Sequence, residues 1–209
     1  MKSNLVPVVV EKDGRSERSF DLFSRIMRDR IILLGTVDEV SAKIVIAQLL
    51  FLEGEAPGKP IQLYINSRGG SVIDGLAIYD TMQLITSPVH TTCIGQAASM
   101  GSFLLAGGHP GERRCLPNSE IMIHELASGL NGKFKDMEAH FKHSKRLAEK
   151  LNQMLAENTG QKLSQIKTDI LVDKWFTAPE ALKYGLIDEI RGCTRSDKAK
   201  LVEEAENSE

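Results

Sequence analysis

The sequence predicts an α/β fold built around a mostly parallel β-sheet. Short β-branched and apolar runs, which are typical of buried strands, alternate with segments whose apolar residues recur at helical spacing. The strands are expected at 31–35, 61–66 and 88–94, and the helices that follow them at 38–53, 72–85 and 103–107. Such alternation implies right-handed βαβ crossovers, and in these sheets sites form at the carboxyl ends of the strands.

The residues before this alternation suggest a separate N-terminal segment. A short strand is expected at 6–10, a charged turn at 14–18 and a helix at 19–27. We therefore divide the chain into an N-terminal segment, a domain and a charged tail that is expected to be disordered. These parts are residues 1–18, 19–193 and 194–209.

The alternating region contains recognisable helix signals. Asp38 or Ser41 can cap the helix at 38–53, and the Pro-Gly-Lys-Pro run at 57–60 breaks the chain after it. The Gly-rich run at 67–71 precedes the helix at 72–85. It lies at the end of a strand, as does the Ser-rich run at 95–102, so both could sit on the same edge of the sheet.

The rest of the domain is predicted to contain short strands and one long helix. Strands are expected at 113–117, 120–124 and 186–190, and helices at 134–158, at 163–172 and after Trp175, where Thr177 and Glu180 form a capping box. The helix at 134–158 has a narrow apolar stripe on otherwise charged faces, which is typical of a seam against another helix or subunit. The stripe consists of Met137, Phe141, Ser144, Ala148, Leu151, Leu155 and Asn158.

Composition narrows the class of protein. The chain has 209 residues, of which 42% are hydrophobic and 26% charged, so one soluble domain with a sizeable core is expected. A net charge of −2 gives no reason to expect nucleic acid as a partner. No apolar run is long enough to span a membrane, and the first residues lack the apolar core of a signal peptide.

The cysteines and the missing phosphate loop exclude further classes of site. Cys93, Cys115 and Cys193 form an odd, sparse set without metal-ligand spacing, which fits reduced thiols in the cytoplasm. We therefore expect no metal site. The sequence contains no Gly-Lys-Ser phosphate-binding loop, so we expect no cofactor, and no use of ATP, in this chain.

The run at 95–102 offers a candidate nucleophile. Ala97-x-Ser99-x-Gly101 is close to the Gly-x-Ser-x-Gly turn that exposes a serine between a strand and a helix, although a Ser/Gly-rich packing turn would look the same. A hydrolytic serine needs a base and a group that orients the base. Of the five histidines, His124 ends an apolar strand before a loop, where an imidazole can face a cleft. Spacing alone does not choose the acid among Asp169, Asp173 and Asp188.

Four groups of motifs, in this order, closely resemble the ClpP family, the proteolytic subunits of ATP-dependent Clp proteases. They stand at 64–70 (Tyr-Ile-Asn-Ser-x-Gly-Gly), 95–102 (Gly-Gln-Ala-Ala-Ser-Met-Gly-Ser), 116–124 (beginning Leu-Pro-Asn-Ser and ending Met-Ile-His) and 178–188 (beginning Ala-Pro-Glu-Ala and ending Tyr-Gly-Leu-Ile-Asp). The resemblance covers residues 5 to about 190. It implies that Ser99 is the nucleophile, His124 the general base and Asp173 the third triad residue. Gly70 and Met100 match the residues whose N–H groups form the oxyanion hole.

The same resemblance implies an architecture and partners. The fold would be a ClpP/crotonase-like spiral of βαβ units with a protruding handle helix at about 132–158, and residues 1–18 would form an axial loop or strand. Subunits of this kind stack as two heptameric rings around a closed chamber, a tetradecamer. An AAA+ unfoldase of the ClpX or ClpA type uses ATP to feed unfolded polypeptides into it.

The sequence departs from the family pattern at several positions. Arg68 replaces a usual proline, Glu125-Leu126 replaces Gln-Pro after the histidine, and Val172 replaces an arginine used between rings. A carboxylate at Glu125 would raise the pKa of the histidine if it approached the ring. The family also has an apolar pocket on the outer ring face for loops of the ATPase. At positions that are usually apolar there, this chain has Gln62, Thr92, Arg114 and Arg191.

These departures leave three readings open besides drift at tolerant surface positions. The main one is an active serine endopeptidase subunit. The second is a weakly active or structural ring subunit that completes a mixed assembly with a sister ClpP. The third is a crotonase-like acyl-CoA enzyme, which would not need Ser99, His124 and Asp173 together.

Overall fold

The computed structural model describes residues 7–13, 16–127, 129 and 132–192, and the expected tail lies outside them. This part of the chain forms the mixed α/β fold that the sequence predicts, around a mostly parallel sheet. The central parallel strands, in spatial order, are β3 (Ile31–Leu34), β4 (Ile61–Ser67), β5 (Val89–Ala98), β6 (Arg113–Cys115) and β9 (Glu189–Ile190). Two strands extend the sheet, β7 (Glu120–Ile123), parallel to β5, and β8 (Lys174–Phe176), antiparallel to β7.

Strand β5 is longer than expected and serves two neighbours in turn. Its first half pairs with β6, where Cys93 lies opposite Cys115, and its end pairs with β7, where Ala98 lies opposite Met122. The register against β4 shifts between these halves, and Gly95 there has a φ of 81°. A bulge of this kind bends a strand, which directs the end of β5 toward the candidate site.

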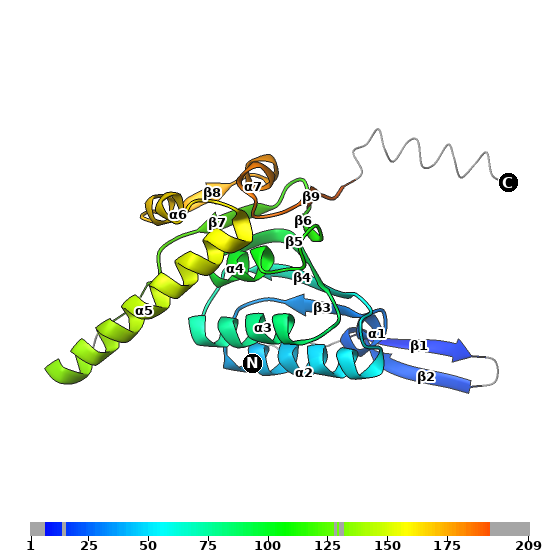
Figure 1. Ribbon diagram of the computed structural model, residues 1–209. Coiled ribbons are helices and arrows are strands. Elements are labelled where there is room, and N and C mark those ends of the chain that lie inside the picture. Colours follow the sequence, from blue (N-terminus) through cyan, green and yellow to red (C-terminus); the bar gives the residue numbers. More distant parts are fainter. Residues whose placement is uncertain (1–6, 14–15, 128, 130–131, 193–209) are drawn as a thin grey trace.

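The helices cover the sheet and extend beyond it. Helices α2 and α3 pack together on one side, and α5 crosses the other end of the domain and projects away from it (Figure 1). The helices are α1 (Leu22–Met27), α2 (Glu39–Glu55), α3 (Val72–Leu84), α4 (Met100–Ala106), α5 (Phe134–Thr159), α6 (Leu163–Asp169) and α7 (Ala178–Tyr184). The core lies between these helices and the sheet, and its largest fully buried side chains include Ile32, Leu49, Leu52, Ile61, Leu63, Ile65, Ile78, Leu104 and Leu105.

Helix α2 begins where the sequence predicts, because of a reciprocal cap. The side chain of Asp38 accepts a hydrogen bond from Ser41 N at 2.8 Å, and Ser41 Oγ accepts one from Asp38 N at 2.9 Å. Both candidate caps are therefore used together, which satisfies two of the N–H groups left open at a helix start.

The N-terminal region differs from the prediction of a charged turn at 14–18 and a helix at 19–27. Strands β1 (Val8–Asp13) and β2 (Ser16–Asp21) form an antiparallel hairpin that crosses the expected boundary at residue 18. Opposite charges face each other across it, as at Lys12 and Glu17 with 3.0 Å between nitrogen and oxygen, and such pairs favour strands. Helix α1 begins only at Leu22, because Asp21 accepts a hydrogen bond from Ser24 N and caps it.

Other boundaries also moved, including those of β6 and β9, which span Arg113–Cys115 and Glu189–Ile190 rather than 113–117 and 186–190. Helix α4 begins at Met100 rather than at 103, and α6 ends at Asp169 rather than at 172. Residues 174–176, which were expected to lead directly into a helix, form β8. The capping box of α7 is confirmed, since Glu180 Oε2 accepts hydrogen bonds from both Thr177 N and Thr177 Oγ1.

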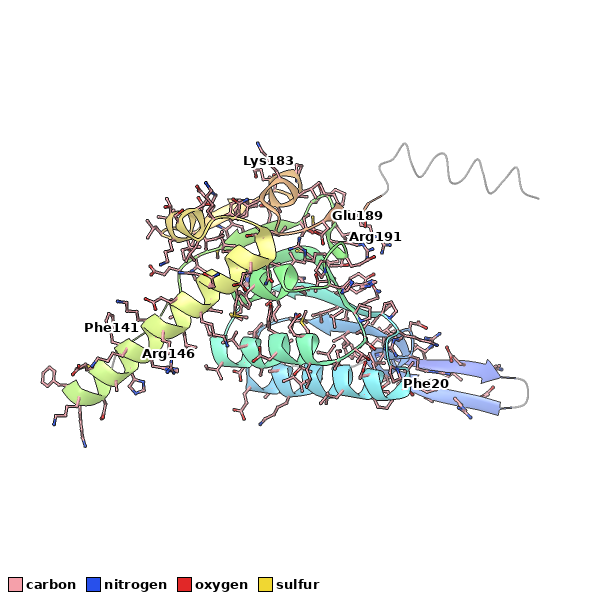
Figure 2. The ribbon with its side chains drawn as sticks, in the orientation of Figure 1. Phe20, Phe141, Arg146, Lys183, Glu189 and Arg191 are labelled. Atoms are coloured by element: carbon pink, nitrogen blue, oxygen red, sulfur yellow. The ribbon has the colours of Figure 1, made fainter. Side chains whose placement is uncertain are left out.

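Helix α5 projects far beyond the domain (Figure 1). At about 1.5 Å per residue its 26 residues extend about 39 Å. Only Leu155, Ala156 and Thr159, near its C-terminal end, are buried. The side chain of Phe141, in the projecting half, is exposed (Figure 2). The predicted helix is thus confirmed, and its apolar stripe reaches the domain only at its C-terminal end.

Within the ranges the structure describes, none of the helices is both long and apolar enough to cross a membrane.

Candidate active site

Ser99 occupies a sharp turn between β5 and α4. Its φ of 55° and ψ of −124° are unusual for a residue with a side chain, and such strained conformations cost about 1–3 kcal/mol and concentrate at functional sites. The turn is held by backbone contacts, because Ser99 N donates to Met122 O at 3.0 Å. Ser102 Oγ also lies 2.7 Å from the carbonyl oxygens of Ser99 and Met122. The Ser99 hydroxyl does not cap α4, so it stays available for chemistry.

The Gly-rich turn after β4 packs directly against Ser99. A Cβ atom on Gly69 would lie 2.6 Å from Ser99 Cβ, and one on Gly101 would lie 2.9 Å from Ser67 Cβ. A Cβ atom on Gly70 would lie only 2.0 Å from Val37 O. Glycine is therefore required at these contacts. The structure confirms the expectation that the two turns share one edge of the sheet.

Two backbone N–H groups beside Ser99 lack an acceptor in the described chain. Around Gly70, Val37 N donates to Gly69 O and Ser71 N donates to Val37 O, which leaves the N–H of Gly70 unpaired. Met100 is the first residue of α4, and its N–H has no intrahelical partner. Both residues line the same cavity as Ser99. Free N–H groups in such a place can bind a developing oxyanion.

The strand pair β7 and β8 brings His124 and Asp173 together. Ile123 lies opposite Lys174 in this pair, so the residue after β7 and the residue before β8 are neighbours. His124 Nδ1 lies 3.6 Å from Asp173 Oδ1, which is longer than a hydrogen bond. The distance still places a carboxylate beside the ring nitrogen that an orienting acid must reach.

The other two candidate acids form hydrogen bonds and ion pairs with residues other than His124. Asp169 accepts from Lys174 Nζ at 2.6 Å and from Tyr184 Oη at 2.7 Å. Asp188 forms a two-point ion pair with Arg113. Although burial raises the pKa of both carboxyls, these hydrogen bonds and charges outweigh it and hold the pKa below 3.8. Of the three aspartates that the sequence left open, the structure brings only Asp173 to His124.

Ser99 and His124 line one cavity of about 130 Å³ without touching through a hydrogen bond among the described residues. Asp173 is exposed, and His124 is partly buried. Catalytic hydrogen bonds are often long in free enzymes and shorten when substrate binds. The structure therefore brings together a serine, a histidine and an aspartate, the residue types that serine hydrolysis needs, without hydrogen bonds between them among the described residues.

Helix α5 supplies one wall of this cavity, which the sequence analysis did not anticipate. It contributes Ala148, Leu151, Asn152 and Leu155, at the end where the stripe meets the domain. Val72, Phe103, Ile123 and Ile170 add further apolar surface. The stripe could have indicated this, but sequence spacing does not say which half of a long helix meets its own domain. The cavity can therefore accept an apolar side chain of a bound molecule close to Ser99.

Glu125 also lines the cavity, but it does not reach the ring. Within the described residues, no ion pair joins it to His124, and the carboxylate beside His124 belongs to Asp173. Glu125 therefore does not approach the imidazole of His124 in this structure.

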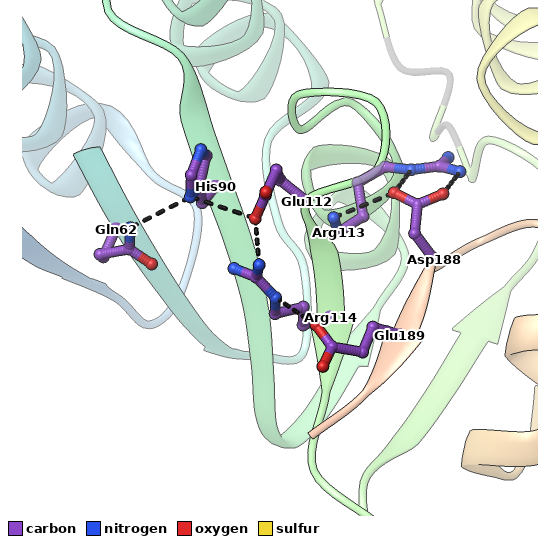
Figure 3. A network of polar contacts seen from close by, with 7 residues as sticks. All are labelled: Gln62, His90, Glu112, Arg113, Arg114, Asp188 and Glu189. Carbon is purple, nitrogen blue, oxygen red and sulfur yellow. Dashed lines mark hydrogen bonds and ion pairs between the residues drawn. The ribbon is translucent and has the colours of Figure 1, made fainter. Parts of the chain in front are cut away.

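A polar network lies at the opposite ends of the strands, on the face where an apolar docking pocket would be expected (Figure 3). Arg114 is only 8% exposed, and its guanidinium contacts Glu112 and, at 2.7 Å, Glu189 Oε2. His90 Nδ1 lies 3.3 Å from Glu112 Oε2 and 3.2 Å from Gln62 Nε2. Burial lowers the pKa of His90 despite the carboxylate beside it.

Thr92 and Arg191, the other two residues at positions that are usually apolar in the family, differ in exposure. Thr92 is buried in β5, whereas Arg191 is exposed. Glu189 and Arg191 lie on the side of the domain away from Phe141 (Figure 2).

The described residues contain no group of three or more His, Cys, Asp or Glu side chains that could hold a metal ion.

A comparison with protein families agrees with this geometry. The model of the Clp protease family matches residues 14–193, which include the whole candidate site. The match also covers the parallel sheet and the projecting helix α5. With most of its length matched in this way, the chain belongs to the Clp protease family.

Proposed function

We propose that this chain is a serine endopeptidase subunit of a barrel-shaped, ATP-dependent Clp protease and that it cleaves unfolded polypeptides in a closed chamber. The observation that carries this is the strained turn at Ser99, which shares one cavity with two unpaired N–H groups and with His124, beside which Asp173 lies. A strained nucleophile with free oxyanion donors is the arrangement that acyl transfer needs.

In this mechanism Ser99 Oγ attacks the peptide carbonyl while His124 accepts its proton. Asp173 orients the imidazole and stabilises the imidazolium, once the 3.6 Å separation shortens to a hydrogen bond. The N–H groups of Gly70 and Met100 bind the oxyanion, and each such donor is worth about 3–4 kcal/mol in comparable sites. His124 then protonates the leaving amine, and water releases the acyl group by the same steps.

Labelling with a fluorophosphonate probe tests the nucleophile. The probe should attach to Ser99, as located by mass spectrometry of the digested protein, and labelling should be lost in His124→Ala. A protein of crotonase-like chemistry would not be labelled, because it has no activated serine. Absence of labelling would therefore reject the peptidase reading.

We propose further that the subunit assembles into two stacked heptameric rings that meet through α5. Support comes from apolar side chains that one domain leaves exposed, because large exposed apolar patches mark interaction surfaces. They lie on β3, α2, α3 and α5, at Leu33, Val40, Ile44, Phe51, Ile73, Leu84 and Phe141.

Phe141→Asp should therefore break double rings into smaller species, because an unpaired charge would be buried at the contact. Phe141→Leu is the matched control, since it keeps an apolar side chain, and should sediment like the wild type. Leu151 is a poorer choice because it lines the cavity. An unchanged sedimentation velocity profile for Phe141→Asp would contradict assembly through α5.

A weakly active or structural subunit in a mixed assembly is the second candidate function. It is favoured by the polar network on the face where the family resemblance places the docking pocket, because Arg114 there is already bound by two carboxylates. A hydrophobic loop of an AAA+ unfoldase gains about 25 cal/mol per Å² from an apolar pocket, and polar groups that resist desolvation reduce this gain. The exposed Val172, where relatives have an arginine between rings, also suggests an altered ring contact.

The isolated protein should accordingly degrade folded, tagged substrates little with ClpX or ClpA and ATP. Adding a sister ClpP should restore degradation, and part of it should depend on Ser99 in the mixed complex. Efficient ATP-dependent degradation by the purified protein alone would overturn this. In either case ATP is used by the unfoldase, and we propose that this chain itself binds no cofactor.

We expect the protein to work in the cytoplasm. Cys93 and Cys115 lie opposite each other on β5 and β6, yet both are free thiols. Burial raises the pKa of Cys93 to about 12 and that of Cys115 to about 11, so neither forms a reactive thiolate. Two cysteines that lie opposite each other and remain reduced are typical of a protein in a reducing compartment.

A further inference from the structure

One of the residues that line the cavity beside Ser99 has a carboxylate side chain. The other lining residues, in the described part of the chain, are Gly70, apolar or uncharged polar residues and His124. Glu125 follows His124 directly and lines the cavity with it. A substrate chain that presents its carbonyl to Ser99 therefore meets one carboxylate among the residues that line this cavity, whereas Asp173 lies beside His124 and does not line it.

The backbone of Glu125 is held in place, while the charge of its carboxylate is not neutralised by any described residue. Glu125 N donates to Ile170 O at 2.8 Å, which ties this segment to the end of α6. Its side chain is exposed, and the described residues provide its carboxylate with no hydrogen bond or ion pair. The cation of Lys174, on the neighbouring strand, is held by Asp169 at 2.6 Å. The free carboxylate thus remains available to a charged group of the substrate.

We propose that Glu125 determines specificity by favouring a basic side chain next to an apolar one at the cleavage site. This rests on the proposed peptidase function. The apolar walls, including Leu151, Phe103 and Ile170, accept the apolar side chain, and Glu125 attracts a lysine or arginine beside it and repels an acidic residue. Screening by salt limits the electrostatic effect of Glu125 to about 8 Å at physiological ionic strength. Glu125 therefore acts on substrate residues close to the scissile bond.

Peptide hydrolysis tests the proposal directly. The peptides share a leucine before the scissile bond and carry lysine, glutamine or glutamate at each neighbouring position in turn. An exposed ion pair corresponds to at most about fivefold in an equilibrium or rate constant. At one position or more, kcat/KM for the lysine peptide should exceed that for the glutamate peptide by about this factor. The ratio should fall toward one in 0.5 M salt.

Glu125→Gln should remove this ratio while glutamine peptides are still cleaved, and Glu125→Lys should invert it. Glu120→Gln is the matched control, because Glu120 is an exposed glutamate on β7 that does not line the cavity. The ratio of kcat/KM between lysine and glutamate peptides should be the same in Glu120→Gln as in the wild type. A ratio that is the same in Glu125→Gln and the wild type overturns this proposal alone. Failure of the wild type to cleave any of the peptides overturns the proposed function and this inference with it.

Discussion

Ser99→Ala is expected to abolish peptide hydrolysis, with kcat falling by about 10⁴-fold or more. The change removes one oxygen atom and leaves the residue with the same Cβ atom in the same strained turn. The hydrogen bonds that hold the turn come from the backbone and from Ser102, so they remain. Hydrolysis of small fluorogenic peptides measures the loss, and sedimentation velocity and circular dichroism should show an unchanged fold and assembly.

Two further serine variants separate chemistry from structure. Ser164→Ala changes an exposed serine on α6 and should keep full activity. Ser99→Gly should be as inactive as Ser99→Ala but more stable, by about 1 kcal/mol, because glycine adopts a φ of 55° with little strain. Activity retained by Ser99→Ala, in a preparation free of contaminating protease, would remove Ser99 from the mechanism.

The parts of the fold that could be predicted from the sequence are those with apolar runs typical of buried strands or with apolar residues at helical spacing. The strands at Ile31–Leu34 and Ile61–Ser67 and the capped helix at Glu39–Glu55 are buried on one side or both, and their apolar patterns follow from that. Strand β8 could not be found in this way, because its three residues are too few to show a period. The N-terminal hairpin depends on pairing between exposed charged strands, which apolar spacing does not report.

The candidate site also has parts that could be predicted from the sequence and parts that could not. The turn at Ser99 and the Gly-rich turn beside it are local features, and their shared edge follows from parallel topology. The choice of Asp173 over Asp169 and Asp188 depends on the antiparallel pairing of β7 with β8, a tertiary feature that residue spacing does not contain. Without the family resemblance, the acid would have stayed undecided. The wall that α5 adds to the cavity could not be predicted, for the same reason.

Asp188→Asn is expected to cause the largest loss of stability. Asp188 accepts from Arg113 Nε at 2.8 Å and from the guanidinium's second nitrogen at 2.5 Å, in the network of Figure 3. Arg113 also donates to Asn158 O at 2.6 Å, at the base of α5, so the pair joins the handle to the sheet. Arg113 is buried, and removing its partner leaves an uncompensated charge. Breaking such a pair typically costs about 3–5 kcal/mol.

Glu189→Gln is the matched control for this variant. Glu189 is the next residue, but it is exposed, and its partner Arg114 keeps a second carboxylate on Glu112. This variant should lose less than about 1 kcal/mol of unfolding free energy. Urea unfolding at one protein concentration, followed by the fluorescence of the single tryptophan, Trp175, measures both. Equal losses in the two variants would contradict a special role for the buried pair.

The pH dependence gives the same prediction a second readout. Burial raises the pKa of Asp188, but hydrogen bonds and charge from Arg113 outweigh it and hold the folded value below the ordinary 3.8. A carboxyl whose pKa is lowered by folding adds stability above its unfolded pKa, and this contribution is lost as pH falls through the folded value. The gap in unfolding free energy between wild type and Asp188→Asn should therefore be constant near neutral pH and narrow below about pH 4. A gap that stayed the same down to pH 3 would mean that the carboxylate charge contributes nothing and that shape alone accounts for the loss.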